Sequence, residues 1–177
     1  MAPADWITSH LPELLFPIDA AVVDELFSLY QRHCVSTASG ITPDSDWVSR
    51  LDQNLEDAST SDDDKAKIRS GRERNPSYYQ GGAILDHNPG AAAMTLDTCV
   101  FVRPGHFDAN TYVHEMVHVG QYGRLGVSGF LAEYFGTSAV TVVEHWAKGE
   151  PVDLMTASHL ENDAYAIGNR FAPEGSR

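Results

Sequence analysis

Two histidines and a glutamate stand at the spacing of a metal site in the stretch "YVHEMVHVGQYGRLG", residues 112–126. On an α-helix, residues four positions apart lie on the same face, so His114 and His118 can direct their imidazoles to one point. Tetrahedral zinc binds imidazole nitrogens in this way. Glu115 lies at the shoulder of that face, where it can contact a water at the metal without being a ligand. The pattern therefore predicts a catalytic metal site with Glu115 as the general base.

The competing interpretation is a buried helix whose two histidines are structural. Tyr112, Val113, Met116 and Val119 occupy the opposite side, so the helix is apolar nearly all round and is expected to be buried. A buried Glu115 beside two buried histidines would cost several kcal/mol if all three lacked partners. A metal ion offsets this cost, which favours the metal site.

A zinc site of this kind needs a third protein ligand. The pattern with another histidine six positions after His118 fails, because Arg124 stands there. The segment "HLENDAYAIGNRF" has a helical pattern and places Glu161 on a face with small residues, which would let it pack closely against the motif helix. Glu161 is therefore the preferred ligand. The sequence leaves five alternatives open, namely Asp163, Glu133, Glu144, His145 and His159.

Other polar side chains are candidates for supporting roles. Tyr165 shares the face of Glu161 and is the first candidate to stabilise the oxyanion that forms when water attacks a carbonyl. A core tyrosine that only supports Glu161 is an equally good interpretation. Gln121 and Asp163 are expected to contact the ligands rather than the substrate. Weaker oxyanion candidates are Tyr122, His106 and His159.

The motif helix is expected to follow a strand and a turn. "TCVFV", residues 98–102, is rich in β-branched and aromatic residues and predicts a strand that "RPG" ends. Asp108 or Asn110 can cap the motif helix, and Gly126 is expected to end it before "VSGFLAEYFG" begins another. The residues before this strand, "GGAILDHNPGAAAMTLD", predict further short strands broken by turns.

The amino-terminal part supplies helices and a polar segment. Apolar residues at helical spacing predict helices in "LFPIDAAVVDELFSLYQRHC" and "TPDSDWVSRLDQNL", the second capped by Asp44 or Ser45. Residues 56–77 are rich in Asp, Ser, Lys and Arg and predict an exposed loop with room for one short helical turn, which could cover the site until it is removed. This segment lacks the Gly and the closing Glu of a calcium-binding loop.

Length and composition bound the class of protein. The 177 residues are expected to form one domain, with packing helices in 1–55 and a core in 80–171 that carries the site. A net charge of −13 disfavours nucleic acid and anionic membranes as partners. No stretch approaches the ~20 apolar residues of a membrane span, and no secretory signal pattern begins the chain. Two cysteines without a CxxC pair fit reduced thiols, so a cytoplasmic location is expected, with export by a route this chain does not encode left open.

The residues "AMTLDTCVFVRPGHFDANTYVHEMVHVGQYGRLGVSGFLAEYF" together with "HLENDAYA" resemble a family of small bacterial zincin-like metallopeptidases. That family occurs alone or as a module of larger proteins, including components of extracellular contractile injection systems. Its motifs are a hairpin ending in "RPG", a His-Glu-x-x-His-Val-x-Gln helix and a later Leu-Glu-x-Glu-Ala-Tyr helix. The first helix motif matches His114 to Gln121, and the second matches Leu160 to Tyr165, with Asp163 in place of its second Glu.

The resemblance implies an α+β fold, mainly helical, with a small antiparallel sheet before the motif helix. It also implies a Zn²⁺ cofactor held by His114, His118 and Glu161, and a metallopeptidase reaction with Glu115 as general base. In zincins an extended substrate commonly pairs with the strand before the motif helix, so "TCVFV" is a candidate substrate edge, with an ordinary core strand as the alternative. The alternatives are a zinc enzyme that hydrolyses or eliminates from a small molecule or modified peptide, and a non-catalytic zincin-like interaction module.

Overall fold

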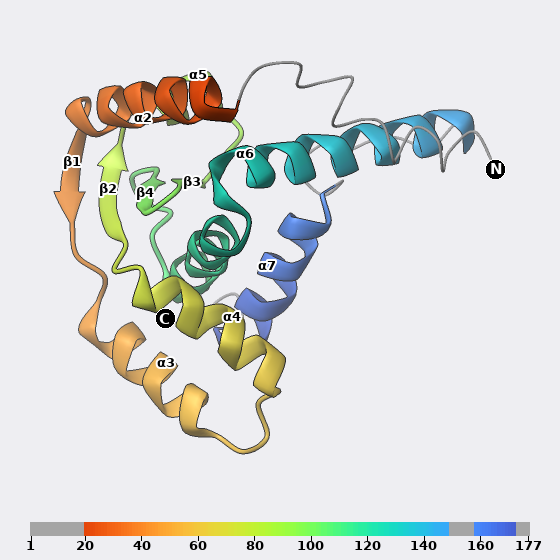
Figure 1. Ribbon diagram of the computed structural model, residues 1–177. Helices are drawn as coiled ribbons and strands as arrows, with labels where there is room; N and C mark the ends of the chain where they lie inside the picture. Colours follow the sequence, from red (N-terminus) through yellow and green to blue (C-terminus); the bar gives the residue numbers. More distant parts are fainter. Residues whose placement is uncertain (1–19, 149–157, 173–177) are drawn as a thin grey trace.

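The computed structural model describes residues 20–148 and 158–172, with side chains in 20–136 and 158–172, and is mostly helical around one small sheet (Figure 1). Its elements, in chain order, are α2 (Ala20–Ser36), β1 (Ala38–Ile41), α3 (Ser45–Glu56), α4 (Asp62–Glu73), β2 (Ser77–Gly81), α5 (Ala83–His87), β3 (Ala93–Leu96), β4 (Cys99–Val102), α6 (Ala109–Lys148) and α7 (His159–Phe171). This content agrees with the predicted α+β class. None of the helices in the described ranges combines the length with the apolar character that a membrane span requires.

The sheet is mixed, where a purely antiparallel sheet was predicted. Its strand order is β1-β2-β4-β3, and the pairs β1–β2 and β3–β4 are antiparallel while β2–β4 is parallel. Parallel pairing requires a crossover, which α5 and the β3–β4 hairpin supply between β2 and β4. Short strands were predicted across residues 81–105, and this prediction is wrong for residues 83–87, which form α5. There Gly82 turns the chain with a φ of +107°, and buried Ala83 to Leu85 form a short helix.

Strand β4, the "TCVFV" segment, was predicted as a possible sheet edge but lies inside the sheet. The side chains of its last three residues, Val100, Phe101 and Val102, are fully buried. Val100 and Val102 join the cluster built around α6, whereas Phe101 joins the cluster beneath α2 and α5. Helices thus cover both faces of this strand, and the edge beside it is β3.

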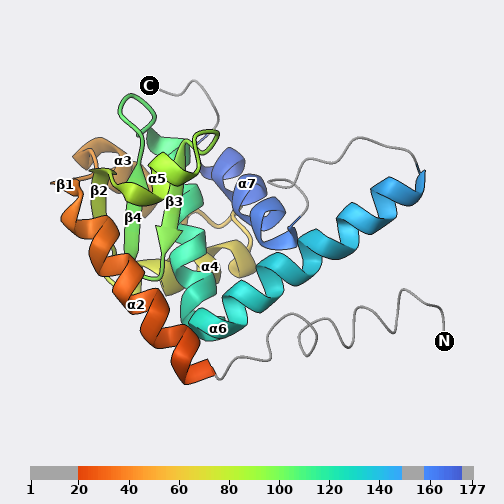
Figure 2. The ribbon, with the colours of Figure 1, turned by 90° about the horizontal axis from the view of Figure 1, so that it is seen from above.

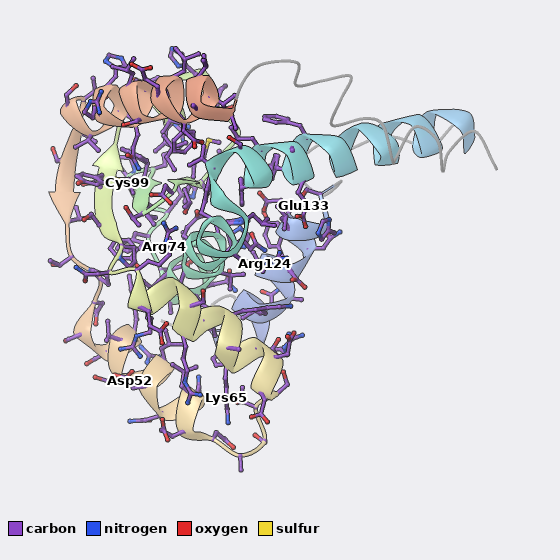
Figure 3. All side chains as sticks on the ribbon, in the orientation of Figure 1. Asp52, Lys65, Arg74, Cys99, Arg124 and Glu133 are labelled. Atoms are coloured by element: carbon purple, nitrogen blue, oxygen red, sulfur yellow. The ribbon has the colours of Figure 1, made fainter. Side chains whose placement is uncertain are left out.

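Helix α4 replaces most of the exposed loop that was predicted for residues 56–77. Ser61 caps it by accepting a hydrogen bond from the backbone N–H of Asp64 at 3.1 Å. Three aspartates in the first turn interact favourably with the positive end of the helix dipole. Its inner face packs against α6 so closely that a Cβ on Gly71 would lie 2.0 Å from the carbonyl oxygen of Met116. Arg74, labelled in Figure 3, donates a hydrogen bond to the Val119 carbonyl of α6 at 3.1 Å. Helix α4 is therefore part of the packed core and not a removable cover over the site.

Helix α6 carries the motif and is broken once. Asp108 caps its start by accepting a hydrogen bond from the Thr111 N–H at 2.8 Å, so Asp108, not Asn110, is the cap. At Gly126 the backbone leaves the helical region, with φ 69° and ψ 173°, which confirms the predicted end of the motif helix. Beyond Gly126 the chain continues as a second helical segment to Lys148. Figure 2 shows the first segment between the sheet and α7, while the second extends away from the body.

Candidate metal centre

The structure brings His114, His118 and Glu161 together in the buried contact between α6 and α7. The two Nε2 atoms lie 3.0 Å apart, and Glu161 Oε2 lies 3.3 Å from His114 Nε2 and 3.4 Å from His118 Nε2. Tetrahedral bonds of about 2.0–2.1 Å place ligand atoms about 3.3 Å from one another. The three atoms therefore already have the separations of a coordination sphere, and these residues lie close enough to bind a metal ion.

Gln121 sets the tautomer of His118. Its Nε2 donates a hydrogen bond to the Leu160 carbonyl at 3.0 Å, which turns its Oε1 toward His118 Nδ1 at 2.8 Å. An amide oxygen only accepts, so Nδ1 carries a proton and Nε2 is the atom left to face Glu161. A metal-ligating histidine needs this arrangement, in which its second nitrogen donates to a fixed acceptor. The contact expected of Gln121 is present.

The charges of the three residues favour a cation between them. Burial raises the pKa of the Glu161 carboxyl, but hydrogen bonds from His114 and His118 outweigh it and hold that pKa well below its usual range. Burial lowers the pKa of His118, but the hydrogen bond and charge of Glu161, followed by the charge of Glu115, raise it to about 9. Positive charge is thus stabilised at His118 Nε2, either as a proton or as a metal ion that displaces it.

Glu115 lies beside His114, His118 and Glu161 but outside their group. It is 4% exposed, and its Oε1 lies 3.9 Å from His114 Nε2. Its Oε2 accepts a hydrogen bond from the Thr95 hydroxyl at 2.7 Å, across the contact between β3 and α6. Sequence reasoning missed Thr95. Its only signal was an inward position on a short strand before the motif, which many threonines share.

Tyr134 is a second hydroxyl that sequence reasoning missed. It lies on the part of α6 beyond Gly126 and donates a hydrogen bond to Glu161 Oε1 at 3.1 Å. Burial raises the pKa of this phenol, and the charge of Glu161 raises it further, so the hydroxyl stays protonated and donates. The break at Gly126 was visible in the sequence, but the return of the chain toward Glu161 was not.

Tyr165 packs against His114 and is partly exposed to solvent. Its ring meets the His114 ring edge-on with centroids 4.5 Å apart, and 42% of the residue is exposed to solvent. The residue that was predicted as a possible oxyanion donor therefore lies beside one of the two motif histidines.

The remaining candidates lie in other contacts. Asp163 pairs with Lys67 of α4 at 2.8 Å, and this hydrogen bond raises the pKa of Lys67, so the expected contact of Asp163 with the ligands is replaced by one with α4. Glu133, labelled in Figure 3, lies 2.6 Å from His159 at the start of α7. Tyr122 stacks on Phe130 with centroids 3.7 Å apart, and His106 is exposed in the turn before α6. The side chains of Glu144 and His145 lie outside the described residues.

Comparisons with models of protein families, with curated proteins and with solved structures found no significant match to this chain. The likeness to bacterial zincin-like metallopeptidases therefore stays a prediction carried by the motif residues.

Proposed function

We propose that this protein is a zinc-dependent hydrolase of the zincin-like type, with peptides as the preferred substrates. The observation that carries the proposal is that the site contains two buried carboxylates, one in contact with both histidines and one beside them. Glu161 places one oxygen 3.3 and 3.4 Å from the two histidine nitrogens, whereas Glu115 lies outside that group with one oxygen 3.9 Å from His114. A structural metal site has no use for the second carboxylate.

The donor set supports zinc as the metal. Two imidazoles and one carboxylate form a three-ligand set typical of catalytic zinc, which leaves a fourth position open. When bound, such an ion polarises a carbonyl oxygen and lowers the pKa of a water molecule to about 7.

Glu115 would act as the general base. Its Oε2 is occupied by the Thr95 hydroxyl, so Oε1 is the oxygen left to take a proton from the attacking water. The same oxygen can then deliver this proton to the leaving amine. Tyr165 would donate a hydrogen bond from its hydroxyl to the carbonyl oxygen of the substrate as that oxygen gains negative charge.

The edge strand β3 would bind an extended peptide. Among the described strands, β3 ends the sheet on the side next to the motif helix, and Thr95 links it directly to Glu115. A peptide added to this edge by backbone hydrogen bonds would pass beside the general base. Strand β3, and not β4, would thus be the strand that pairs with the substrate.

Charge and thiol chemistry support the proposed setting. The net charge of −13 argues against nucleic acid and anionic membranes as partners. Cys34 and Cys99 are free thiols, which fits the expected cytoplasmic location.

The test is incubation of the zinc-loaded protein with a mixed peptide library, followed by mass spectrometry of the products. We expect cleavage by the wild type and none by Glu115→Gln, which keeps the size of the side chain but removes the base. Absence of peptide cleavage, together with turnover of esters or small amides that depends on Glu115, would favour the small-molecule alternative. Zinc binding without any turnover would leave the interaction module.

A further inference from the structure

The carboxylate of Glu161 is held from both sides. Its Oε2 faces the two histidine nitrogens at 3.3 and 3.4 Å, and its Oε1 accepts the hydrogen bond from Tyr134 at 3.1 Å. An ionised carboxylate has no hydrogen to give, so the tyrosine must be the donor. Each oxygen therefore has a separate partner.

This division decides how Glu161 can bind a metal. A carboxylate that rotates freely presents either oxygen, or both, to an ion. With Oε1 bonded to a hydroxyl that comes from another helix, only Oε2 remains directed at the histidines. We infer that Tyr134 is a positioning residue that keeps Glu161 a one-oxygen ligand and so sets the affinity and geometry of the metal site. The inference rests on the proposed metal site.

The fold gives Tyr134 a fixed direction of approach. Its ring stacks on Phe130 with centroids 5.8 Å apart, and Phe130 in turn meets the His118 ring edge-on at 6.1 Å. The segment that carries both aromatic residues leaves the motif helix at Gly126, whose φ of +69° is strained for other residues. Loss of the hydroxyl alone leaves this aromatic packing in place, which makes Tyr134→Phe a narrow test.

The experiment compares metal binding by the wild type, Tyr134→Phe and a matched control. Tyr30→Phe is the control, because it also removes one hydroxyl that contacts another element. The Tyr30 hydroxyl lies 3.2 Å from His87 Nδ1. Tyr30 belongs to α2, which lies far from α7 in the fold (Figure 1). Zinc affinity is measured by competition with a chromophoric chelator, and geometry by the visible spectrum of the cobalt-substituted proteins. We expect Tyr134→Phe to bind zinc about 10–100-fold more weakly, as is typical when a contact to a ligand is lost.

The cobalt spectrum separates positioning from general loosening. We expect Tyr134→Phe to shift the absorption bands of cobalt, whereas Tyr30→Phe keeps both the affinity and the spectrum of the wild type. Wild-type affinity and spectrum in Tyr134→Phe would overturn the inference while leaving the metal site intact. A wild-type protein that binds no zinc would instead overturn the proposed function, so the two failures are distinguishable.

Discussion

Glu115 and Glu161 are the same residue type in the same buried site, and comparison of the two regions shows what assigns a carboxylate its role. Each has one oxygen bonded to a hydroxyl from a neighbouring element, Thr95 for Glu115 and Tyr134 for Glu161. The difference lies in the oxygen that remains. For Glu161 it lies within 3.4 Å of both histidine nitrogens, whereas for Glu115 it lies 3.9 Å from His114.

The backbone causes this difference. Glu115 follows His114 directly on α6, so its side chain leaves the helix beside the face of the two histidines, not along it. Glu161 comes from α7 and meets that face from the opposite side. Placement by separate helices, not chemical type, thus separates the proposed ligand from the proposed base.

The largest effect should come from removing the proposed ligand. In Glu161→Ala the histidines lose the carboxylate that completes their group, so we expect stoichiometric zinc in the wild type to fall to near zero in the variant. Metal content by mass spectrometry on protein purified without chelator measures this. Zinc retained at about one ion per chain would move the third ligand away from Glu161.

Removing the proposed base should leave the metal and stop the chemistry. Glu115→Gln keeps the hydrogen bond with Thr95 available but takes no proton, so we expect unchanged zinc content and a rate lower by about 10²–10⁴-fold. Steady-state kinetics on a peptide identified from the library gives the ratio. A rate that stays within a few fold of the wild type would make the two carboxylates less different than proposed.

The pH dependence of stability and of zinc affinity should be set more by Glu161 than by Glu115. His118 has its pKa raised from 6.5 to about 9 in the folded protein, and Glu161 contributes more to this rise than Glu115 does. In the metal-free protein this stabilisation is fully present below pH 6.5 and is lost as pH rises toward about 9. Zinc competes with the same proton, so its apparent affinity should rise by up to about tenfold per pH unit over this window.

Urea unfolding of the chelator-treated protein and zinc titrations, both from pH 6 to 9, check this expectation. Glu161→Gln should remove most of the dependence of unfolding on pH, because it removes the negative charge that holds the proton on His118 and leaves only a neutral hydrogen-bond acceptor in its place. Glu115→Gln should only reduce it. An equal loss in the two variants would contradict the ranking of the two carboxylates.

Local sequence patterns predicted several helices, including the two that carry the proposed ligands. The apolar spacing of α2, α3 and α7, a cap at Asp108 or Asn110, and the break at Gly126 are properties of a few neighbouring residues, and the structure selects Asp108 as the cap. Histidine spacing placed two side chains on one helix face without knowledge of the rest of the fold. The pairing of that face with Glu161 was also accessible, because small residues on its helix indicated close packing.

Contacts between distant segments were not predictable in the same way. Helix α4 was missed because its contact with α6 uses glycines, Gly71 and Gly120, where large apolar residues would have marked a buried face. The parallel pairing of β2 with β4 depends on a crossover that no local pattern specifies. Thr95 and Tyr134 reach the two carboxylates from 20 and 27 residues away along the chain, so no short spacing encodes them.

The smallest effect should come from loosening Glu115 without removing it. Thr95→Val keeps the shape of the side chain but leaves the buried Oε2 of Glu115 without its 2.7 Å hydrogen bond. We expect about a tenfold lower rate, at the low end for residues that orient a functional group, with zinc affinity unchanged. The free energy of unfolding should fall by about 1–3 kcal/mol, because a buried acceptor loses its partner.

Kinetics, zinc competition and urea unfolding on Thr95→Val and Tyr134→Phe together give the sharpest form of the comparison. Each variant removes one hydroxyl from one carboxylate, so the first should lower the rate and spare the affinity, while the second should lower the affinity. If Thr95→Val weakened zinc binding as much as Tyr134→Phe does, Glu115 would itself belong to the coordination sphere. The roles of base and ligand would then be shared between the two carboxylates instead of divided.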